Sequence, residues 1–212
     1  MAATKLSIYQ GAVLACEERK LASLTENRES RRLLDGVWDR NGLRTCLQLG
    51  QWNFATRVAR IEYEPSITPE FGYRYAFEKP SDFVRTVAVC QDEHYRSPLT
   101  SYEDKTGYWW ADLQPIYVQF VSDGVQYGLD YSLWPPNFER MVEHYFANQI
   151  VGRLTSNRQL RKDVKDAFDY WLLQAKNTDA MEQPAKFPPR GSWASARGGR
   201  STDGGSRGSL IG

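Results

Sequence analysis

Cysteine and histidine are scarce in this sequence, which restricts the chemistry available to the protein. Cys16, Cys46 and Cys90 are far apart and form no C-x-x-C pair, so neither a disulfide framework nor a zinc site is expected. Buried, reduced thiols are the simpler interpretation. His94 and His144 are the only histidines, and neither lies in H-E-x-x-H or beside a recognised nucleophile motif.

Motifs that bind phosphate are also missing. The sequence contains neither G-x-x-x-x-G-K-[ST] nor G-x-G-x-x-G, so no loop of a known type is predicted to hold a nucleotide. Two carboxylates could form a glycosidase pair, but 26 acidic residues offer many pairings and the sequence selects none. We therefore expect a protein that is not an enzyme, with no catalytic residues, no cofactor and no metal.

Long hydrophobic runs are absent as well. No stretch of about 18 apolar residues occurs, so we expect no transmembrane helix and no membrane partner. Residues 1–6 lead directly into a mixed polar segment that lacks the pattern of a signal peptide, which favours synthesis in a cytoplasm.

Charge is unevenly distributed along the chain. Residues 185–212 contain one acidic residue, Asp203, and five basic ones: Lys186, Arg190, Arg197, Arg200 and Arg207. Their net charge is 5 − 1 = +4, and because the whole chain carries +1, the remaining body carries 1 − 4 = −3. A mildly acidic body is not typical of a protein whose folded surface binds nucleic acid tightly.

Apolar residues at helical spacing dominate residues 133–176. A first stripe follows Trp134-Pro135-Pro136 and comprises Phe138, Met141, Val142, Tyr145, Phe146, Ile150 and Leu154. A second comprises Leu160, Val164, Phe168, Trp171, Leu172 and Ala175. Steps of three and four place each stripe on one helix face. Ser156 with Gln159 has the pattern of a capping box for the second helix. Two such helices need a further partner to bury both faces.

Two more helices are predicted before residue 55. The first, over residues 4–19, rests on apolar residues at steps of three and four: Leu6, Tyr9, Val13 and Cys16. The second is predicted over residues 28–49. Gly36 and Gly42 weaken this prediction, because glycine costs about 1 kcal/mol relative to alanine inside a helix.

The pattern changes to strict alternation after residue 55, which is typical of half-buried strands. The alternating groups are Ala59, Ile61 and Tyr63; Tyr73, Tyr75 and Phe77; Val87 and Val89; and Ile116, Val118 and Phe120. Residues 104–107 have the composition of a hairpin turn. The predicted class is therefore α+β. Residues 1–55 and 132–180 form a helical bundle, residues 56–131 form an antiparallel β insert, and residues 181–212 form an extended tail.

The tail is rich in Pro, Gly, Ser and Arg, which disfavours regular structure. Phe187 and Trp193 are isolated aromatics in it, with Arg190 and Arg197 close by. Such a segment frequently becomes ordered on a partner, so these four residues are candidate anchors. Arg197-Gly198-Gly199-Arg200 also resembles the arginine–glycine segments that bind single-stranded nucleic acid, and a protein partner is an equal alternative.

Tyr108, Trp109 and Trp110 form the most aromatic stretch of the insert. Adjacent aromatics on a hairpin can stack on sugar rings, so a carbohydrate platform is one interpretation. The alternative, which we favour, is that alternate residues face the core and a ring lies at a contact with another subunit or a tail protein.

Several segments together resemble the tail tubular protein A family of tailed bacteriophages. They are residues 21–38, residues 50–55, residues 108–121, Trp134-Pro135 with Phe138, residues 175–180, and Ser192-Trp193 with Ala196-Arg197. They cover most of the chain in the order expected for the family. The glycine-rich residues after Arg197 do not take part in the resemblance.

The resemblance implies a structural virion protein at the head–tail interface, called a head-to-tail adaptor or gatekeeper. Such proteins form a ring, usually of twelve subunits, beneath the portal. The helical part docks on the portal ring, the β insert faces the tail nozzle or next tail protein, and double-stranded DNA passes through the lumen without specific binding. The C-terminal extension reaches the portal, which would make Phe187, Arg190, Trp193 and Arg197 portal-binding residues. A head-closure connector of a long-tailed phage and a carbohydrate-binding tail component are alternative functions.

Overall fold

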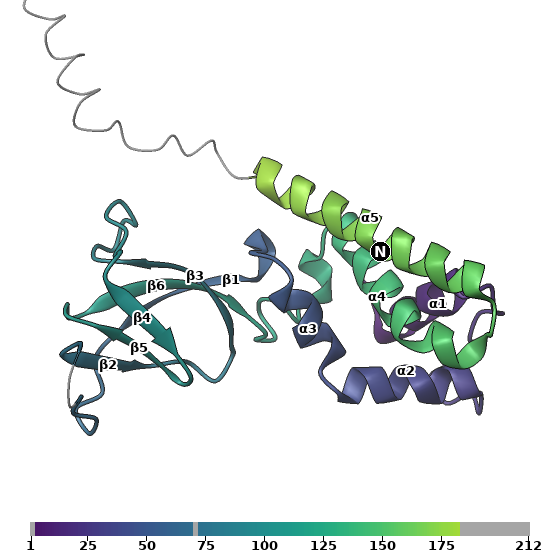
Figure 1. Ribbon diagram of the computed structural model, residues 1–212, viewed down its shortest axis with the longest axis horizontal. Coiled ribbons are helices and arrows are strands. Elements are labelled where there is room, and N and C mark those ends of the chain that lie inside the picture. The colour runs from purple at the N-terminus through teal and green to yellow at the C-terminus, as the bar shows by residue number, and fades with distance from the viewer. Residues whose placement is uncertain (1–2, 70–71, 183–212) are drawn as a thin grey trace, which may run out of the picture. The chain divides into compact units, whose positions relative to one another are not determined.

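The computed structural model describes residues 3–69 and 72–182 and confirms the predicted α+β class (Figure 1). Its helices are α1 (Lys5–Ala15), α2 (Glu29–Asp39), α3 (Gly42–Gln48), α4 (Pro136–Leu154) and α5 (Arg158–Glu182). Its strands are β1 (Thr56–Ile61), β2 (Tyr75–Glu78), β3 (Phe83–Cys90), β4 (Tyr102–Lys105), β5 (Tyr108–Ala111) and β6 (Ile116–Ser122). Short 3₁₀ turns at Asn53–Ala55 and Tyr131–Leu133 flank the strands.

Helix α4 is the centre of the helical part. It contacts α1, α2, α3 and α5. Its buried apolar residues therefore point in several directions and include Phe138, Met141, Val142, Phe146, Ala147, Ile150 and Val151. A helix that is apolar on most sides must be covered on most sides. The N-terminal helices supply the cover that α5 alone cannot, as the sequence predicted.

Both N-terminal helices are shorter than predicted. The helix expected over residues 4–19 ends at Ala15, because Glu17 adopts a left-handed conformation with φ 59°. The helix expected over residues 28–49 is two helices. Asn41, also left-handed with φ 60°, separates them. Gly42 permits the close approach at this corner, since a Cβ there would lie 2.8 Å from the carbonyl oxygen of Val37.

The start of α5 differs from the predicted capping box of Ser156 and Gln159. Instead, Asn157 is the capping residue: its Oδ1 accepts the backbone N–H groups of Gln159 at 3.0 Å and Leu160 at 3.4 Å. The side chain of Gln159 donates forward to Asp163 at 2.7 Å rather than back to the start of the helix.

The strands form two three-stranded antiparallel sheets. Sheet A has the order β1-β6-β3 and sheet B the order β2-β5-β4. Their inner faces pack together, with Phe77 and Trp109 of sheet B in one core with Val118 and Phe120 of sheet A. The ring of Trp109 lies 6.4 Å from that of Phe120. The predicted hairpin joins β4 to β5, and Gly107 in its turn has φ 83°, which favours glycine.

The segments that lead into and out of the strands both pack on the first turn of α4. The ring centroid of Phe138 lies 4.9 Å from that of Trp52, 4.8 Å from Phe54 and 4.9 Å from Trp134. Asn53 also binds the last turn of α5, because its backbone N–H donates to Oδ1 of Asp179 at 2.7 Å. These contacts fix where the sheets begin relative to the helices.

Gly128 and Gly152 provide a matched test of how closely the segment after β6 packs on the rest of the protein. A Cβ at Gly128 would lie 2.4 Å from the carbonyl oxygen of Ser122 and 2.7 Å from Leu47, whereas one at Gly152 in α4 would meet nothing within 4 Å. We expect Gly128→Ala to lower the free energy of unfolding by at least about 2 kcal/mol. Gly152→Ala should raise it by about 0.5–1 kcal/mol through helix propensity. Urea denaturation measures both, and equal effects would contradict the close approach at Gly128.

Candidate functional site

The four residues predicted to bind a portal, Phe187, Arg190, Trp193 and Arg197, lie outside the described residues. The helix that precedes them is described. Only Val164, Ala175 and Asp179 of α5 are buried, and its outward side carries the exposed apolar residues Tyr170, Leu173 and Met181. These three recur at steps of three and eight, so they share one side of the helix. Three apolar side chains are therefore exposed on one side of α5, among exposed polar residues such as Asp166 and Asn177.

Trp109, predicted at an interface, is a core residue. Its side chain is fully buried, its ring lies edge-on to Phe83 with centroids 5.2 Å apart, and its Nε1 donates to Oγ1 of Thr86 at 2.9 Å. The ammonium of Lys79 lies 5.4 Å from its ring centroid. No part of this side chain is left for a partner or a sugar.

Tyr108 and Trp110 point the opposite way and are partly exposed. They lie on β5, the middle strand of sheet B, with ring centroids 6.2 Å apart. The register places Trp110 between Ala76 and Glu103. The indole Nε1 of Trp110 is buried and has no hydrogen-bond partner among the described residues. Alternation along β5 thus divides the predicted trio into one core residue and two surface residues.

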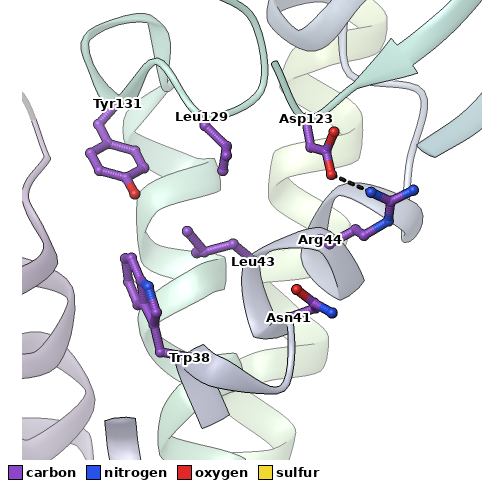
Figure 2. A pocket seen from close by; sticks show the side chains of 7 residues that line it. All are labelled: Trp38, Asn41, Leu43, Arg44, Asp123, Leu129 and Tyr131. Atoms are coloured by element: carbon purple, nitrogen blue, oxygen red, sulfur yellow. Dashed lines mark hydrogen bonds and ion pairs between the residues drawn. The ribbon is translucent and has the colours of Figure 1, made fainter. Parts of the chain in front are cut away.

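Arg44, which the sequence did not single out, joins the helices to the sheets. From α3 its guanidinium donates to the carboxylate of Asp123 and to the carbonyl oxygen of Phe83. Figure 2 shows this pair at one end of a small pocket that Trp38 and Tyr131 line at the other end. The pocket measures about 150 Å³, well below the roughly 300–1,000 Å³ typical of small-molecule sites.

A second hollow follows β1 and the connection between β2 and β3, and measures about 400 Å³. Its cationic residues already have carboxylate partners. Arg57 donates to Asp82 at 2.8 Å, Arg60 lies 2.6 Å from Glu62, and Lys79 pairs with Asp104. Charges neutralised in this way favour a structural role over recognition of an anion.

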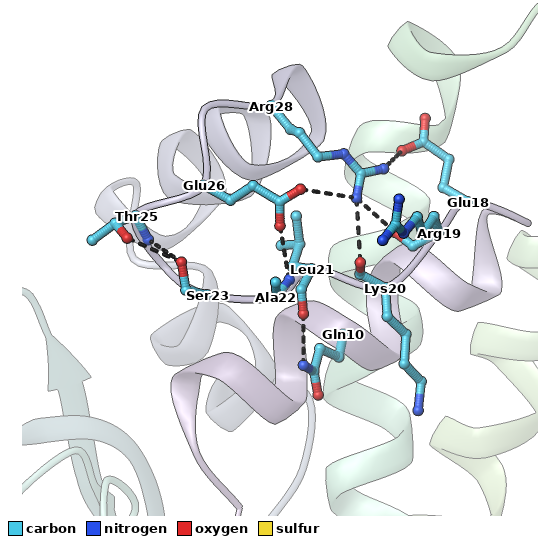
Figure 3. A network of polar contacts seen from close by, with 10 residues as sticks. All are labelled: Gln10, Glu18, Arg19, Lys20, Leu21, Ala22, Ser23, Thr25, Glu26 and Arg28. Carbon is cyan, nitrogen blue, oxygen red and sulfur yellow. Dashed lines mark hydrogen bonds and ion pairs between the residues drawn. The ribbon is translucent and has the colours of Figure 1, made fainter.

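The connection between α1 and α2 is held by Arg28 (Figure 3). Its Nη1 donates to the carbonyl oxygen of Arg19 at 2.8 Å and its Nη2 to Glu18 at 3.1 Å. From α1, Gln10 donates to the carbonyl oxygen of Leu21 at 2.7 Å. Leu21 is buried while nearby Leu24 is exposed. Single-sequence patterns do not reveal such a network, because Arg19 and Leu21 accept through backbone carbonyl oxygens that every residue has.

Glu143 is a buried carboxylate in the helical part. From α4 it packs against α1, where Gly11 provides the room: a Cβ at Gly11 would lie 2.1 Å from its carboxyl carbon. Arg140 donates to it at 3.2 Å. Burial raises the pKa of Glu143 to about 7, and the nearby Glu139 adds to this increase while Arg140 opposes it.

Other titratable groups in the described part of the chain are also buried or stacked on aromatic rings. His144 stacks on Trp171 with centroids 6.4 Å apart, and burial lowers its pKa. Cys16, Cys46 and Cys90 are buried, as predicted. Among residues 3–69 and 72–182, no group of three or more His, Cys, Asp or Glu side chains is placed to hold a metal ion.

Comparisons with known proteins give no family for this chain. No protein-family model matches it, and no curated protein matches it. In the part of the chain that the structure describes, no helix is long and apolar enough to cross a bilayer.

Trp109 and Trp110 are adjacent in sequence but differ in burial, which yields a paired prediction. We expect Trp109→Ala to lower the free energy of unfolding by about 3–5 kcal/mol, since it removes a fully buried ring. Trp110→Ala should cost roughly 1 kcal/mol, the centre of the range for point mutations. Chemical denaturation checks both values. A larger loss from Trp110→Ala would contradict the assignment of faces on β5.

Glu143 should make stability depend on pH near neutrality. Its folded pKa of about 7 lies above the ordinary 4.5, so the folded state binds the proton more tightly. Its contribution is therefore fully present below pH 4.5 and is lost as pH rises through 7. We expect Glu143→Gln to remove this slope and to raise the free energy of unfolding at pH 8 by about 2–3 kcal/mol.

Denaturation curves at pH 5 and pH 8 measure the effect of Glu143→Gln. The matched control is Asp166→Asn, which changes an exposed carboxylate on α5 and should leave the slope unchanged. A slope that persists in Glu143→Gln would assign the pH dependence to another group.

Proposed function

We propose that this protein is a head-to-tail adaptor, or gatekeeper, of a tailed bacteriophage. In this role, copies of the chain form a ring, of twelve subunits by analogy with the family, between the portal and the tail nozzle. The proposal rests on two features of the C-terminal region, which are exposed apolar residues on α5 and a basic segment after it. Three exposed apolar residues of α5 are followed by residues 183–212, which carry a net charge of +4. Such a combination suits docking of the C-terminal region on an acidic protein surface with apolar pockets.

The helical part and α5 would supply the portal-facing side of the adaptor. Tyr170, Leu173 and Met181 are exposed there, and Phe187 and Trp193 follow in the tail. In the proposal the two tail aromatics fill pockets of the portal, and Arg190 and Arg197 pair with acidic groups beside them. Ordering a tail costs roughly 1–2 kcal/mol per residue, so a few anchors repeated around a ring would carry the joint.

The charge of the body supports a lumen through which DNA slides. Residues 1–184 carry a net charge of −3, and a surface that neutralises no phosphates gains no counterion release. Double-stranded DNA would then pass without specific binding. Arg57 and Arg60 on β1 are already paired with carboxylates within the protein, which is consistent with this view.

The β insert would face the tail nozzle or the next tail protein. Tyr108 and Trp110 provide an aromatic surface on sheet B, and aromatic residues are enriched at protein interfaces. A head-closure connector of a long-tailed phage is the variant of this proposal in which the tail partner differs. A carbohydrate-binding role would have to rest on Tyr108 and Trp110 alone, because Trp109 is buried.

The test mixes the protein with the portal ring of its phage and weighs the complexes by native mass spectrometry. The full chain is compared with a chain truncated after Gln183. We expect a complex with the full chain and at least tenfold weaker binding after truncation. Absence of a complex with either chain would overturn the adaptor proposal, and glycan binding by Tyr108→Ala and Trp110→Ala variants would be measured next.

Trp193→Ala refines the same experiment. We expect weaker portal binding with no change in the unfolding transition, because the core contacts that the structure describes are made by residues 3–69 and 72–182. Ser201→Ala, in the same tail, is the matched control and should bind as the unaltered chain does. Full binding by Trp193→Ala would remove this anchor from the proposal.

A further inference from the structure

Positive charge is concentrated at the turn between α4 and α5. Residues 153–165 contain one acidic residue, Asp163, and five basic ones: Arg153, Arg158, Arg161, Lys162 and Lys165. Their net charge is 5 − 1 = +4, and because residues 1–184 carry −3, the rest of that region carries −3 − 4 = −7. The acidic average of the body therefore hides one strongly basic segment. We call its five basic residues the basic end.

The basic end is a surface at the far end of the helical part. All five of its residues are exposed. Arg158, Lys162 and Lys165 follow at steps of four and three in α5, which places them on one helix face. Helix α4 begins beside the sheets, and its 19 residues span roughly 28 Å, so the turn that follows it lies away from the insert (Figure 1).

Arg161 holds the start of α5 to the end of α4. Its Nε donates to the carbonyl oxygen of Thr155 and its Nη2 to that of Gly152, both at 3.0 Å. Arg153 is the next residue after Gly152, in the last turn of α4. Charges from both helices are thus fixed at one corner. The surface ends at Asp166 and Asp169, one turn further along α5.

The charges of the basic end are not neutralised within the protein. Among residues 3–69 and 72–182, no carboxylate forms an ion pair with any of the five. The one carboxylate of this segment, Asp163, accepts a hydrogen bond from Gln159 at 2.7 Å. Arg57, Lys79 and Lys105 of the insert, by contrast, each have a carboxylate partner. The cations at the α4–α5 turn therefore remain available to an anion outside the chain.

Helix stability does not explain cations at this place. Arg158 is the first residue of α5, and Lys162 follows about one turn later, where the positive end of the helix dipole disfavours positive charge. The start of the helix is itself already capped, since Asn157 Oδ1 accepts from the backbone N–H groups of Gln159 and Leu160. Charges that oppose local stability are typical of binding surfaces.

The composition of the basic end suits phosphate better than a protein partner. Protein contact surfaces usually have an apolar or aromatic centre and are poor in lysine. Residues 153–165, all of which the structure describes, include no exposed large apolar side chain. Phosphate groups are bound by Arg and Lys together with Ser, Thr, Asn and Gln side chains, and Ser156 and Gln159 are exposed between the cations.

We propose that the basic end contacts the phosphate backbone of double-stranded DNA without reading its bases. The inference goes beyond the adaptor role and requires neither the ring nor the portal. Arg158, Lys162 and Lys165 bind phosphate oxygens, and Arg161 positions them. A contact made by a few exposed side chains is weak and is screened by salt. Since the rest of the body carries −7 and repels the duplex, DNA held only at this surface can still slide.

The first test measures binding of the full chain to a labelled DNA duplex by fluorescence anisotropy as the salt concentration is varied. The variant combines Arg158→Gln, Lys162→Gln and Lys165→Gln. We expect at least about tenfold weaker binding at low salt, and a plot of log affinity against log salt that is shallower by about 2–3, since each lost phosphate contact removes roughly 0.9 from the slope. Two duplexes of unrelated sequence should bind equally.

The matched control removes the same amount of charge elsewhere. It combines Arg74→Gln, Arg96→Gln and Lys176→Gln, which change exposed cations that also have no ion pair in the described part of the chain. We expect this control to bind DNA nearly as the unaltered chain does. Equal losses in the two triple variants would assign binding to net charge and overturn the proposal.

Other outcomes identify a different partner. Unchanged DNA binding with loss of the portal complex in the first triple variant would assign the basic end to an acidic protein surface and overturn the proposal. Much tighter binding to duplex RNA than to DNA, or to one DNA sequence than to another, would also overturn it. Since the DNA measurement contains no portal, its failure leaves the adaptor proposal standing.

Lysine footprinting gives a second measurement on the unaltered full chain. The protein is briefly acetylated with and without the DNA duplex, and the modified lysines are quantified by mass spectrometry. We expect the duplex to slow acetylation of Lys162 and Lys165 severalfold and to leave exposed Lys176, on the same helix, unchanged. Equal protection of the three lysines, or no protection of the first two, would show that DNA does not lie on the basic end.

Discussion

The packing of aromatic rings around Phe138 is the contact on which the arrangement of this protein depends. Phe138 lies in the first turn of α4, and the segments before β1 and after β6 both reach it through Trp52, Phe54 and Trp134. These rings bury large apolar areas and prefer edge-on contacts, which restricts their relative orientation. The helical core and both ends of the insert are therefore fixed by one cluster.

The central position of α4 follows from the same constraint. Once its first turn is held by the two connecting segments, the apolar residues along the rest of the helix need cover, and α1, α2, α3 and α5 provide it. Most of α5 remains exposed because it covers only one side of α4. The outer side of α5 is thus exposed because of the architecture. The proposed docking surface lies on this outer side, whose exposed apolar residues are not part of the helical core.

Polar contacts between helices and sheets are few and specific. Arg44 and Arg85 from one side, and Asn53 with Asp179 from the other, bind mainly backbone groups or a single carboxylate. Hydrogen bonds of this kind contribute modest net stability, but their geometry is strict. They orient the insert relative to the helices.

Sequence patterns by themselves determined the class of fold, the two long C-terminal helices, the strands and the hairpin before Tyr108, because burial imposes periods of 3.6 and two on the chain. They also determined that alternate residues of the 108–110 stretch face opposite sides of the strand, but not which residue faces the core. The packing of the two sheets decided that Trp109 is inside.

The left-handed residues Glu17 and Asn41, which shorten the first two predicted helices, leave no periodic signal. Glu143 beneath Gly11 and Arg44 paired with Asp123 join residues more than 70 positions apart, and such partners are determined by tertiary packing alone.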